Sequence, residues 1–238
     1  MKILILGGTA EARHLAAALV ALNHDVTTAL AGRTVAPLQV SGQLRTGGFG
    51  GVQGLATYIA AENFERVIDA THPYAEQISR HAALASQHTS RPLLRLLRPG
   101  WEEQPGADWQ RVADMTAAAM ALPKGAIVLL TTGHRGLEAF SKREDCRFIV
   151  RLIEAPTTVL ASNMHLVLSR PPYSIDDETR LMQSEQITHL VSKNSGGVQT
   201  MAKLAAAQAL GVGIIMINRP DYDYGTAAAS VDNALGLL

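Results

Sequence analysis

The chain has 238 residues, enough for one large domain or two small ones. Basic and acidic residues both number 21, so the net charge is zero and the chain has no overall field for a polyanion such as nucleic acid. Apolar residues make up 47%, which excludes a disordered chain, and the single cysteine excludes an intrachain disulfide. No stretch approaches the roughly 20 apolar residues of a membrane span, and the apolar run 3–6 is too short for a signal peptide. We therefore expect a soluble cytoplasmic protein that binds neither membrane nor nucleic acid.

The first half of the chain alternates strand and helix patterns. The apolar run at 3–6, bounded by glycines, is typical of a strand buried on both faces. An alanine-rich helix is predicted over 10–22, and a β-branched strand over 25–30. Further strands are predicted at 43–46, 67–70 and 92–97, with helices at 52–61 and 75–86. This alternation predicts a parallel sheet covered by helices on both faces.

Turn-forming residues over 98–106 predict a linker, after which a second alternating series begins. Its predicted strands are 126–130, 147–153, 165–169, 189–192 and 213–217. Its predicted helices are 137–142, 176–184, 198–210 and 232–237. The fold class is therefore α/β, with two doubly wound Rossmann-like domains that have parallel sheets and a cleft between them. We place the first domain at 1–98 and the second at 99–238; the two halves do not align as a sequence repeat.

A glycine-rich turn joins the first predicted strand to the first predicted helix. We expect it to bind a dinucleotide through Gly7, Gly8, Thr9, Ala10 and Glu11. Glycine lets a phosphate approach the backbone there, and the helix N-terminus supplies amide donors. The fingerprint is degenerate, because Thr9 and Ala12 occupy two usual glycine positions, and a plain tight turn is the alternative. Glu11 brings an anion to the first helical turn, where it would complement the helix dipole or bind a hydroxyl.

The end of the second predicted strand indicates the type of cofactor. NAD sites usually have a carboxylate there for the ribose 2′-hydroxyl. This chain has Gly32 and Arg33 instead, so an arginine is available for a 2′-phosphate. The sequence therefore favours NADP over NAD, with a solvated surface arginine as the alternative.

Three polar clusters follow later strands, at 71–74, 131–135 and 192–197. Each lies where a predicted parallel strand ends and a helix begins, which is the edge where open α/β sheets bind ligands. One such cluster would be an ordinary capping turn, but three with histidines, an arginine and a lysine predict binding. We expect Thr71 and His72 to contact the cofactor. We expect the substrate to be contacted by Tyr74, Thr132, Gly133, His134, Arg135, Lys193, Asn194, Ser195 and Gly196.

Other residues are interpreted as structural or solvated. Arg91, Arg95 and Arg98 are read as solvated charges, with a place at the border of the cleft as the alternative. Cys146 lies beside Asp145, which disfavours a thiolate, so a structural role is expected. The sequence has no nucleophile elbow, no P-loop, no short-chain dehydrogenase Tyr/Lys pair and no zinc-spaced histidine pair, and we expect no metal site.

Five segments together resemble the precorrin-6A reductases of cobalamin biosynthesis. They are residues 5–12, 69–75, 131–135, 151–153 and 192–197. The motifs Thr-His-Pro-Tyr-Ala at 71–75 and Ser-Lys-Asn-Ser-Gly-Gly at 192–197 are specific, and the likeness covers almost the whole chain. The resemblance implies an NADPH-dependent reduction of one double bond of the precorrin-6A macrocycle to give precorrin-6B, without metal or flavin. Cobalt-precorrin-6A reductases look similar, so the likeness leaves open whether cobalt is already in the ring.

In this reaction the nicotinamide supplies the hydride, so the chain must orient a polyanionic macrocycle and deliver a proton. The candidate proton donors are His72, Tyr74, His134 and Lys193, with none preferred. We expect the first domain to bind the dinucleotide and the second to hold the macrocycle, although loop 192–197 would alternatively meet the cofactor. A non-catalytic NADP-binding sensor and a glycosyltransferase-like enzyme are the other hypotheses. The sensor would not explain the polar clusters of the second half.

Overall fold

The computed structural model describes residues 1–32, 38–222 and 225–238. The chain forms two compact units: unit 1 contains Met1–Pro99 and Pro220–Leu238, and unit 2 contains Gly100–Arg219. These bounds differ from the predicted domains, 1–98 and 99–238, because the C-terminal segment returns to unit 1. The reason is long-range pairing: Ala228 forms a sheet pair with Leu96 and is buried in the core of unit 1.

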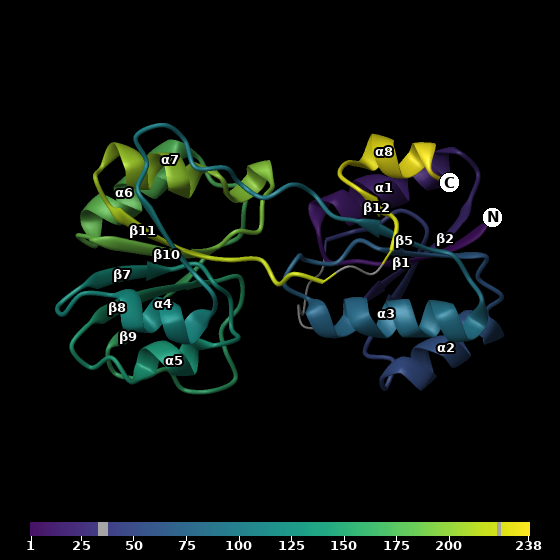
Figure 1. The fold of residues 1–238 in the computed structure, drawn as a ribbon, viewed down its shortest axis with the longest axis horizontal. Helices are drawn as coiled ribbons and strands as arrows, with labels where there is room; N and C mark the ends of the chain where they lie inside the picture. The colour runs from purple at the N-terminus through teal and green to yellow at the C-terminus, as the bar shows by residue number, and fades with distance from the viewer. Residues whose placement is uncertain (33–37, 223–224) are drawn as a thin grey trace. The chain divides into compact units, whose positions relative to one another are not determined.

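Unit 1 is a six-stranded parallel sheet with helices on both faces (Figure 1). Its strands are β1 (Lys2–Leu6), β2 (Asp25–Leu30), β3 (Gln43–Thr46), β4 (Arg66–Asp69), β5 (Leu93–Leu96) and β12 (Ala227–Ala228). Its helices are α1 (Ala10–Ala21), α2 (Val52–Ala61), α3 (Glu76–Thr89) and α8 (Val231–Gly236). The strand order is β12-β5-β4-β1-β2-β3, the doubly wound order with the C-terminal strand in the sixth position.

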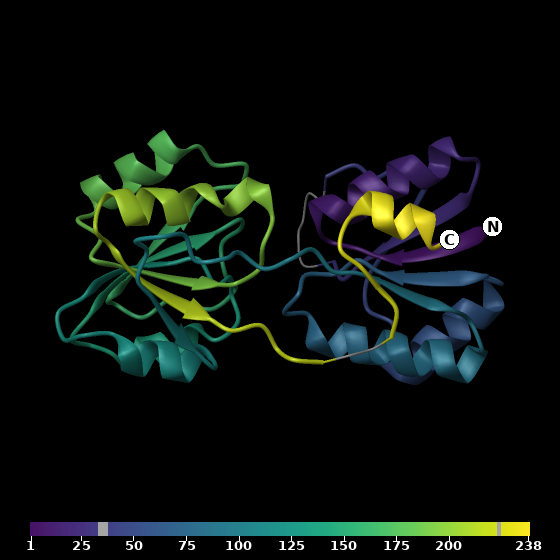
Figure 2. The same cartoon turned by 45° about the horizontal axis from the view of Figure 1, so that its top comes forward.

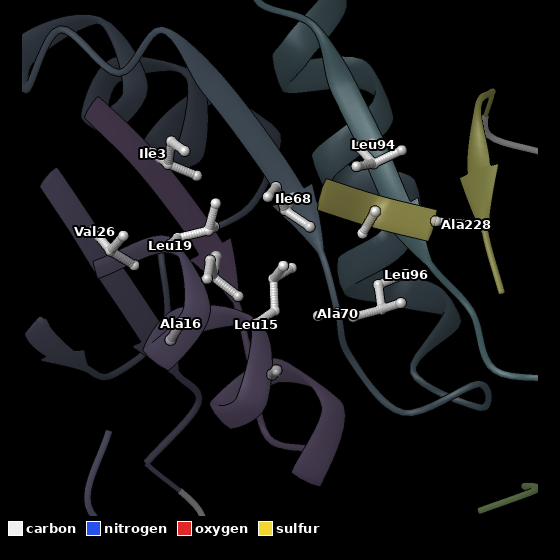
Figure 3. Packing of buried hydrophobic residues seen from close by; sticks show 13 residues of the cluster. Ile3, Leu15, Ala16, Leu19, Val26, Ile68, Ala70, Leu94, Leu96 and Ala228 are labelled. Carbon is white, nitrogen blue, oxygen red and sulfur yellow. The ribbon is translucent and has the colours of Figure 1, made fainter. Parts of the chain in front are cut away.

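Strand β1 is buried on both faces, as predicted from its continuous apolar run. Ile3 and Ile5 belong to the cluster that α1 and α8 cover, whereas Leu4 and Leu6 belong to the cluster under α2 and α3. Figure 3 shows the first cluster, in which Leu15 and other side chains of α1 pack against the sheet. Full burial of one such aliphatic side chain stabilises the fold by roughly 1.5–3 kcal/mol, so β1 anchors the loop that follows it.

Unit 2 has the same architecture. Its strands are β6 (Trp109–Val112), β7 (Ile127–Leu130), β8 (Arg147–Leu152), β9 (Met164–Leu168), β10 (His189–Lys193) and β11 (Gly213–Ile217). Its helices are α4 (Met115–Ala121), α5 (Leu137–Ser141), α6 (Ile175–Ser184) and α7 (Ala202–Ala209), with a 3-10 turn η1 (Val198–Thr200) before α7. The parallel strands follow the order β6-β11-β10-β7-β8-β9. Helices α6 and α7 cover one face of this sheet, and α4 and α5 cover the other (Figure 2).

The predicted fold class, two doubly wound Rossmann-like domains with parallel sheets, is confirmed. Three elements were missed: β6, α4 and β12. Strand β6 falls just after the predicted linker, and β12 has only two residues. The start of helix α4 could have been predicted from the sequence, because Asp114 is a favourable N-cap residue before an alanine-rich run. Its side chain accepts a hydrogen bond from the Ala117 amide at 2.8 Å. The predicted helix 198–210 is divided into η1 and α7.

Candidate functional site

Each unit has one place where neighbouring strands lead to helices on opposite faces of the sheet. In unit 1, β1 leads to α1 and β4 leads to α3; in unit 2, β7 leads to α5 and β10 leads to α7. Open α/β sheets bind ligands at such a switch point, outside the carboxyl ends of the strands. The glycine loop and loop 71–74 therefore flank the switch point of unit 1. Loops 131–135 and 193–197 flank the switch point of unit 2.

The two glycines after β1 have different roles. A Cβ on Gly7 would lie 2.8 Å from Thr28 Cγ2 and 3.3 Å from Leu30 Cδ2, so glycine lets the loop pack against β2. Gly8 has a φ of 119°, and a side chain there would project into open space. Gly7 is thus required for packing, whereas Gly8 leaves the backbone open to a ligand.

Thr9 is the N-cap of α1. Its hydroxyl oxygen accepts from the Ala12 amide at 3.1 Å and donates to the Ala70 carbonyl at 2.8 Å. This side chain therefore ties the glycine loop to the end of β4. The ligand-binding groups that the predicted loop offers are consequently the backbone amides of the first turn, which begins at Ala10.

The predicted anion in that turn, Glu11, is paired. Its carboxylate lies 2.6 Å from Arg98 Nη1. The arginine lowers the repulsion that Glu11 would exert on a phosphate, and neither predicted alternative for Glu11 named this partner. The interpretation of Arg98 as a solvated charge is wrong, because its side chain is mostly buried against Glu11.

Loop 71–74 is fixed by a carboxylate at the end of β4. Asp69 is buried and accepts hydrogen bonds from the Thr71 amide at 3.1 Å and the Thr71 hydroxyl at 2.6 Å. The exposed His72 accepts at Nδ1 from the Tyr74 amide at 3.3 Å. When this imidazole is neutral, its hydrogen is therefore on Nε2, which can donate a hydrogen bond. Thr71, His72 and Tyr74 thus lie together at the switch point of unit 1.

A buried arginine on β5 supports this loop. Arg95 was interpreted as a solvated charge, yet it is 7% exposed and lies 3.6 Å from Asp69. Its guanidinium also stacks on the Tyr222 ring at 4.4 Å and donates to the Tyr222 carbonyl at 3.2 Å. The tyrosine hydroxyl donates to the Pro73 carbonyl at 2.7 Å. Pairing of the two predicted strands would have indicated this ion pair, since Asp69 and Arg95 are register partners on adjacent strands.

In unit 2, the loop after β7 is joined to β10. The amide and the hydroxyl of Thr131 both donate to the Val191 carbonyl at 3.1 Å. The hydroxyl oxygen of Thr132 is buried and has no hydrogen-bond partner among the described residues. Thr132 therefore retains an unused polar group at this edge of the sheet.

Lys193 connects the two loops of the unit 2 switch point. Its Nζ donates to the Thr132 carbonyl at 2.7 Å. Burial, and then the nearby Arg135 charge, lower the pKa of this ammonium below its usual value. Gly133 has a φ of 79°, and His134 and Arg135 are exposed. The edge thus gathers two cationic side chains and a histidine, a set suited to carboxylates.

The rest of loop 193–197 is held by bonds within unit 2. Asn194 Oδ1 accepts from the Trp101 amide at 2.7 Å, and its Nδ2 donates to the Trp101 carbonyl at 3.1 Å. The Asn194 side chain is therefore engaged by the backbone, although the sequence predicted a substrate contact. The Ser195 amide donates to the Lys193 carbonyl at 2.7 Å, and Gly196 has a φ of 65°.

Unit 2 also contains a buried charged cluster that was not predicted from the sequence. Arg151 Nη1 lies 2.8 Å from Glu178 Oε2 and its guanidinium stacks 4.1 Å above the Tyr173 ring. Lys203 donates to the Thr200 carbonyl at 2.9 Å and lies 4.6 Å from the centre of the Trp101 ring. Burial lowers the pKa of Lys203 to about 7. Three ionisable side chains are thus buried together in the core of unit 2.

The remaining predictions have mixed outcomes. Arg33 lies outside the described residues, whereas Gly32 follows β2 with a φ of 73°. Cys146 is buried, and burial raises the pKa of its thiol, in agreement with a structural role. Among the residues 1–32, 38–222 and 225–238, no cluster of His, Cys, Asp or Glu side chains is arranged to hold a metal ion. The described helices include none long and apolar enough to span a membrane.

Comparisons with known proteins identify the family of the chain. The family model described as precorrin-6x reductase CbiJ/CobK matches residues 2–238. The precorrin-6A reductase of Rhodococcus erythropolis is 44% identical, over 100% of this chain and 96% of that protein. The cobalt-precorrin-6A reductase of Priestia megaterium is 27% identical, over 99% and 97%. A solved structure described as CobK precorrin-6A reductase has a TM-score of 0.95 and 38% identity, and the match covers 100% of this chain and 95% of that one. The chain therefore belongs to the precorrin-6x reductase family of oxidoreductases.

Proposed function

We propose that the protein reduces precorrin-6A to precorrin-6B with NADPH, binding the dinucleotide on unit 1 and the macrocycle on unit 2. The observation that carries this proposal is the presence of paired polar loops at the switch point of each unit. Each unit has one ligand-binding edge of its own, and the two edges differ in chemistry. Unit 1 offers a glycine loop and helix amides, whereas unit 2 offers cationic side chains.

The residues of unit 1 fit a dinucleotide. The space beside Gly8 is open, and its φ of 119° exposes the backbone to a phosphate. The twelve-residue helix α1 directs its N-terminus to the same place, and the charge of Glu11 is offset by Arg98. Thr71 and His72 follow the neighbouring strand β4, so they would contact the same ligand. The preference for the 2′-phosphate rests on the sequence alone, through Gly32 and Arg33.

The residues of unit 2 fit a polycarboxylate. The side chains of Lys193 and Arg135 supply charge-assisted donors, and His134 adds a titratable group beside them. The buried Thr132 hydroxyl adds a polar group without a partner among the described residues. We infer that these groups bind the acidic side chains of the macrocycle, together with the backbone around Ser195 and Gly196.

Bound NADPH supplies the hydride, so the chain itself must orient the macrocycle and provide a proton. The four candidate donors are His72, Tyr74, His134 and Lys193. The lowered pKa of Lys193 makes its ammonium a stronger acid than an ordinary lysine. Lys193 is therefore the candidate that local chemistry favours.

The higher identity to the precorrin-6A reductase than to the cobalt-precorrin-6A reductase supports precorrin-6A as the substrate. The test is an anaerobic assay with purified protein, NADPH and either precorrin-6A or its cobalt complex. We expect loss of NADPH absorbance and a product two hydrogens heavier, faster with precorrin-6A and slower with NADH. Binding of NADPH without its consumption would support the sensor hypothesis and contradict the enzyme.

A further inference from the structure

The chain passes from unit 1 to unit 2 at Pro99–Gly100, here called the outward passage. It comes back to unit 1 at Arg219–Pro220, the return passage. Residues beside the return passage make hydrogen bonds to a switch-point loop in each unit. We propose that Arg219 and Tyr222 are positioning residues, with Arg219 holding loop 193–197 and Tyr222 holding loop 71–74. This inference rests on the proposed function, because it assigns the ligand of each loop from it.

Tyr222 is placed to fix the backbone of loop 71–74. Its hydroxyl donates to the Pro73 carbonyl at 2.7 Å, between the two side chains predicted to act on ligands, His72 and Tyr74. Arg95 fixes the tyrosine in turn, through its stacked guanidinium and its bond to the Tyr222 carbonyl. Burial raises the pKa of the tyrosine hydroxyl, so it remains a donor at neutral pH.

Arg219 is placed to fix loop 193–197. Its Nε donates to the Asn194 carbonyl at 2.6 Å, and Asn194 directly follows Lys193. The Asn194 carboxamide also binds Trp101, which lies beside the outward passage. A Cβ on Gly100 would approach this carboxamide to 3.1 Å, so the outward passage is closely packed on it. Asn194 therefore meets both passages of the chain.

The outward passage has the same pattern, which argues against chance. Arg98 pairs with Glu11 in the first turn after the glycine loop of unit 1. Trp101 Nε1 donates to the Gly197 carbonyl of unit 2 at 3.1 Å. Each passage thus bonds to one switch-point segment in each unit. If these bonds served only to hold the chain, breaking one would reduce stability without distinguishing between the two ligands.

The chain supplies a matched control for Tyr222→Phe. The hydroxyl of Tyr173 also donates to a backbone carbonyl, that of Ser169 at 3.0 Å, and its ring also stacks under an arginine, Arg151. Neither Ser169 nor Tyr173 belongs to a switch-point loop. Tyr173→Phe therefore removes the same kind of bond at a place where no ligand is expected.

We expect Tyr222→Phe to raise the NADPH dissociation constant about three- to tenfold, measured by fluorescence titration, because one hydrogen bond is lost. Its KM for precorrin-6A should remain within about a factor of two of the wild-type value. Arg219→Met should show the converse: a KM for precorrin-6A raised about tenfold, because the lost donor is charged, and an unchanged affinity for NADPH. Arg219→Lys keeps the charge, so its KM for precorrin-6A should lie between those of the wild type and Arg219→Met. It replaces Arg219→Met if that variant does not fold.

Tyr173→Phe should leave both constants unchanged, and thermal denaturation should show a folded state for every variant compared. Wild-type affinity for NADPH in Tyr222→Phe would overturn the proposal, as would equal losses in the two tyrosine variants. Wild-type protein that binds no NADPH would instead refute the proposed function, and the positioning role of Tyr222 with it.

Discussion

Replacing Lys203 by methionine should change how the stability of the protein depends on pH. The lysine side chain is 3% exposed, and burial followed by the charge of Arg151 lowers its pKa from 10.5 to about 7, while Glu178 acts in the opposite direction. The substitution keeps the long apolar stem and removes the ionisable group. It leaves Arg151 and Glu178 as a neutral pair.

The sign follows from the direction of the pKa change. Between pH 7 and 10.5 the unfolded chain binds a proton at this lysine that the folded chain does not, so stability rises with pH in that window. Across this window the free energy of unfolding changes by about 1.4 kcal/mol per pH unit. The cost of burying the charged amine is therefore about 5 kcal/mol at and below pH 7, and this pH-dependent cost vanishes above pH 10.5. Lys203→Met also loses the hydrogen bond to the Thr200 carbonyl, which reduces the variant's gain in free energy of unfolding by about 1 kcal/mol.

The assay is urea denaturation of both proteins at pH 6, 7, 8 and 9, with the free energies of unfolding compared at each pH. We expect Lys203→Met to be more stable by about 4 kcal/mol at pH 6, and the advantage to shrink by about 1.4 kcal/mol per unit above pH 7. Lys124→Met is the control, because Lys124 lies exposed in the turn before β7. The control should show no trend that depends on pH.

A difference between Lys203→Met and wild type that stays constant from pH 6 to pH 9 would refute the reasoning. It would mean that the amine keeps an ordinary pKa in the folded protein. A variant that is less stable at every pH would show that the bond to Thr200 and the contact with Trp101 outweigh the cost of burying the charge.

Three further predictions concern single side chains. Lys193→Ala should raise the KM for precorrin-6A roughly ten- to hundredfold, since a charge-assisted bond is worth ~1.5–3 kcal/mol, and steady-state kinetics should show this while the NADPH dissociation constant stays within about a factor of three. Loss of NADPH binding instead would assign loop 193–197 to the cofactor. Arg33→Ala should weaken NADPH and spare NADH in parallel titrations, and equal losses would show that Arg33 does not read the 2′-phosphate. Cys146→Ser should keep most of its turnover, because the thiol is buried beside the Pro123 carbonyl; an inactive but folded variant would contradict that role.

The sequence was sufficient to predict the loops of both switch points. Parallel strands end at the same edge of a sheet, so each polar run after an apolar strand identifies a position at that edge. The partners that hold the loops were harder to predict, because they come from distant positions. Pro73 and Tyr222 are 149 residues apart in the chain, and no local pattern relates them. Arg95 was misread for a similar reason: one charge in a strand looks solvated until the neighbouring strand supplies Asp69.

The predicted boundary between residues 98 and 99 lies one residue from the observed one, but the C-terminal segment was assigned to the wrong unit. Each sheet completes its doubly wound order with a strand from outside its main series. Strand β6 precedes that series in unit 2, and β12 follows the whole of unit 2 before it joins unit 1. A fragment ending at residue 98 would lack Ala228 and Ala234, which are buried in the same cluster as Ile3 and Leu15. It would also lack Tyr222, and with it the bond to loop 71–74. The proposed dinucleotide site is therefore the product of a discontinuous unit, in which residues 220–238 complete both the core and the loop.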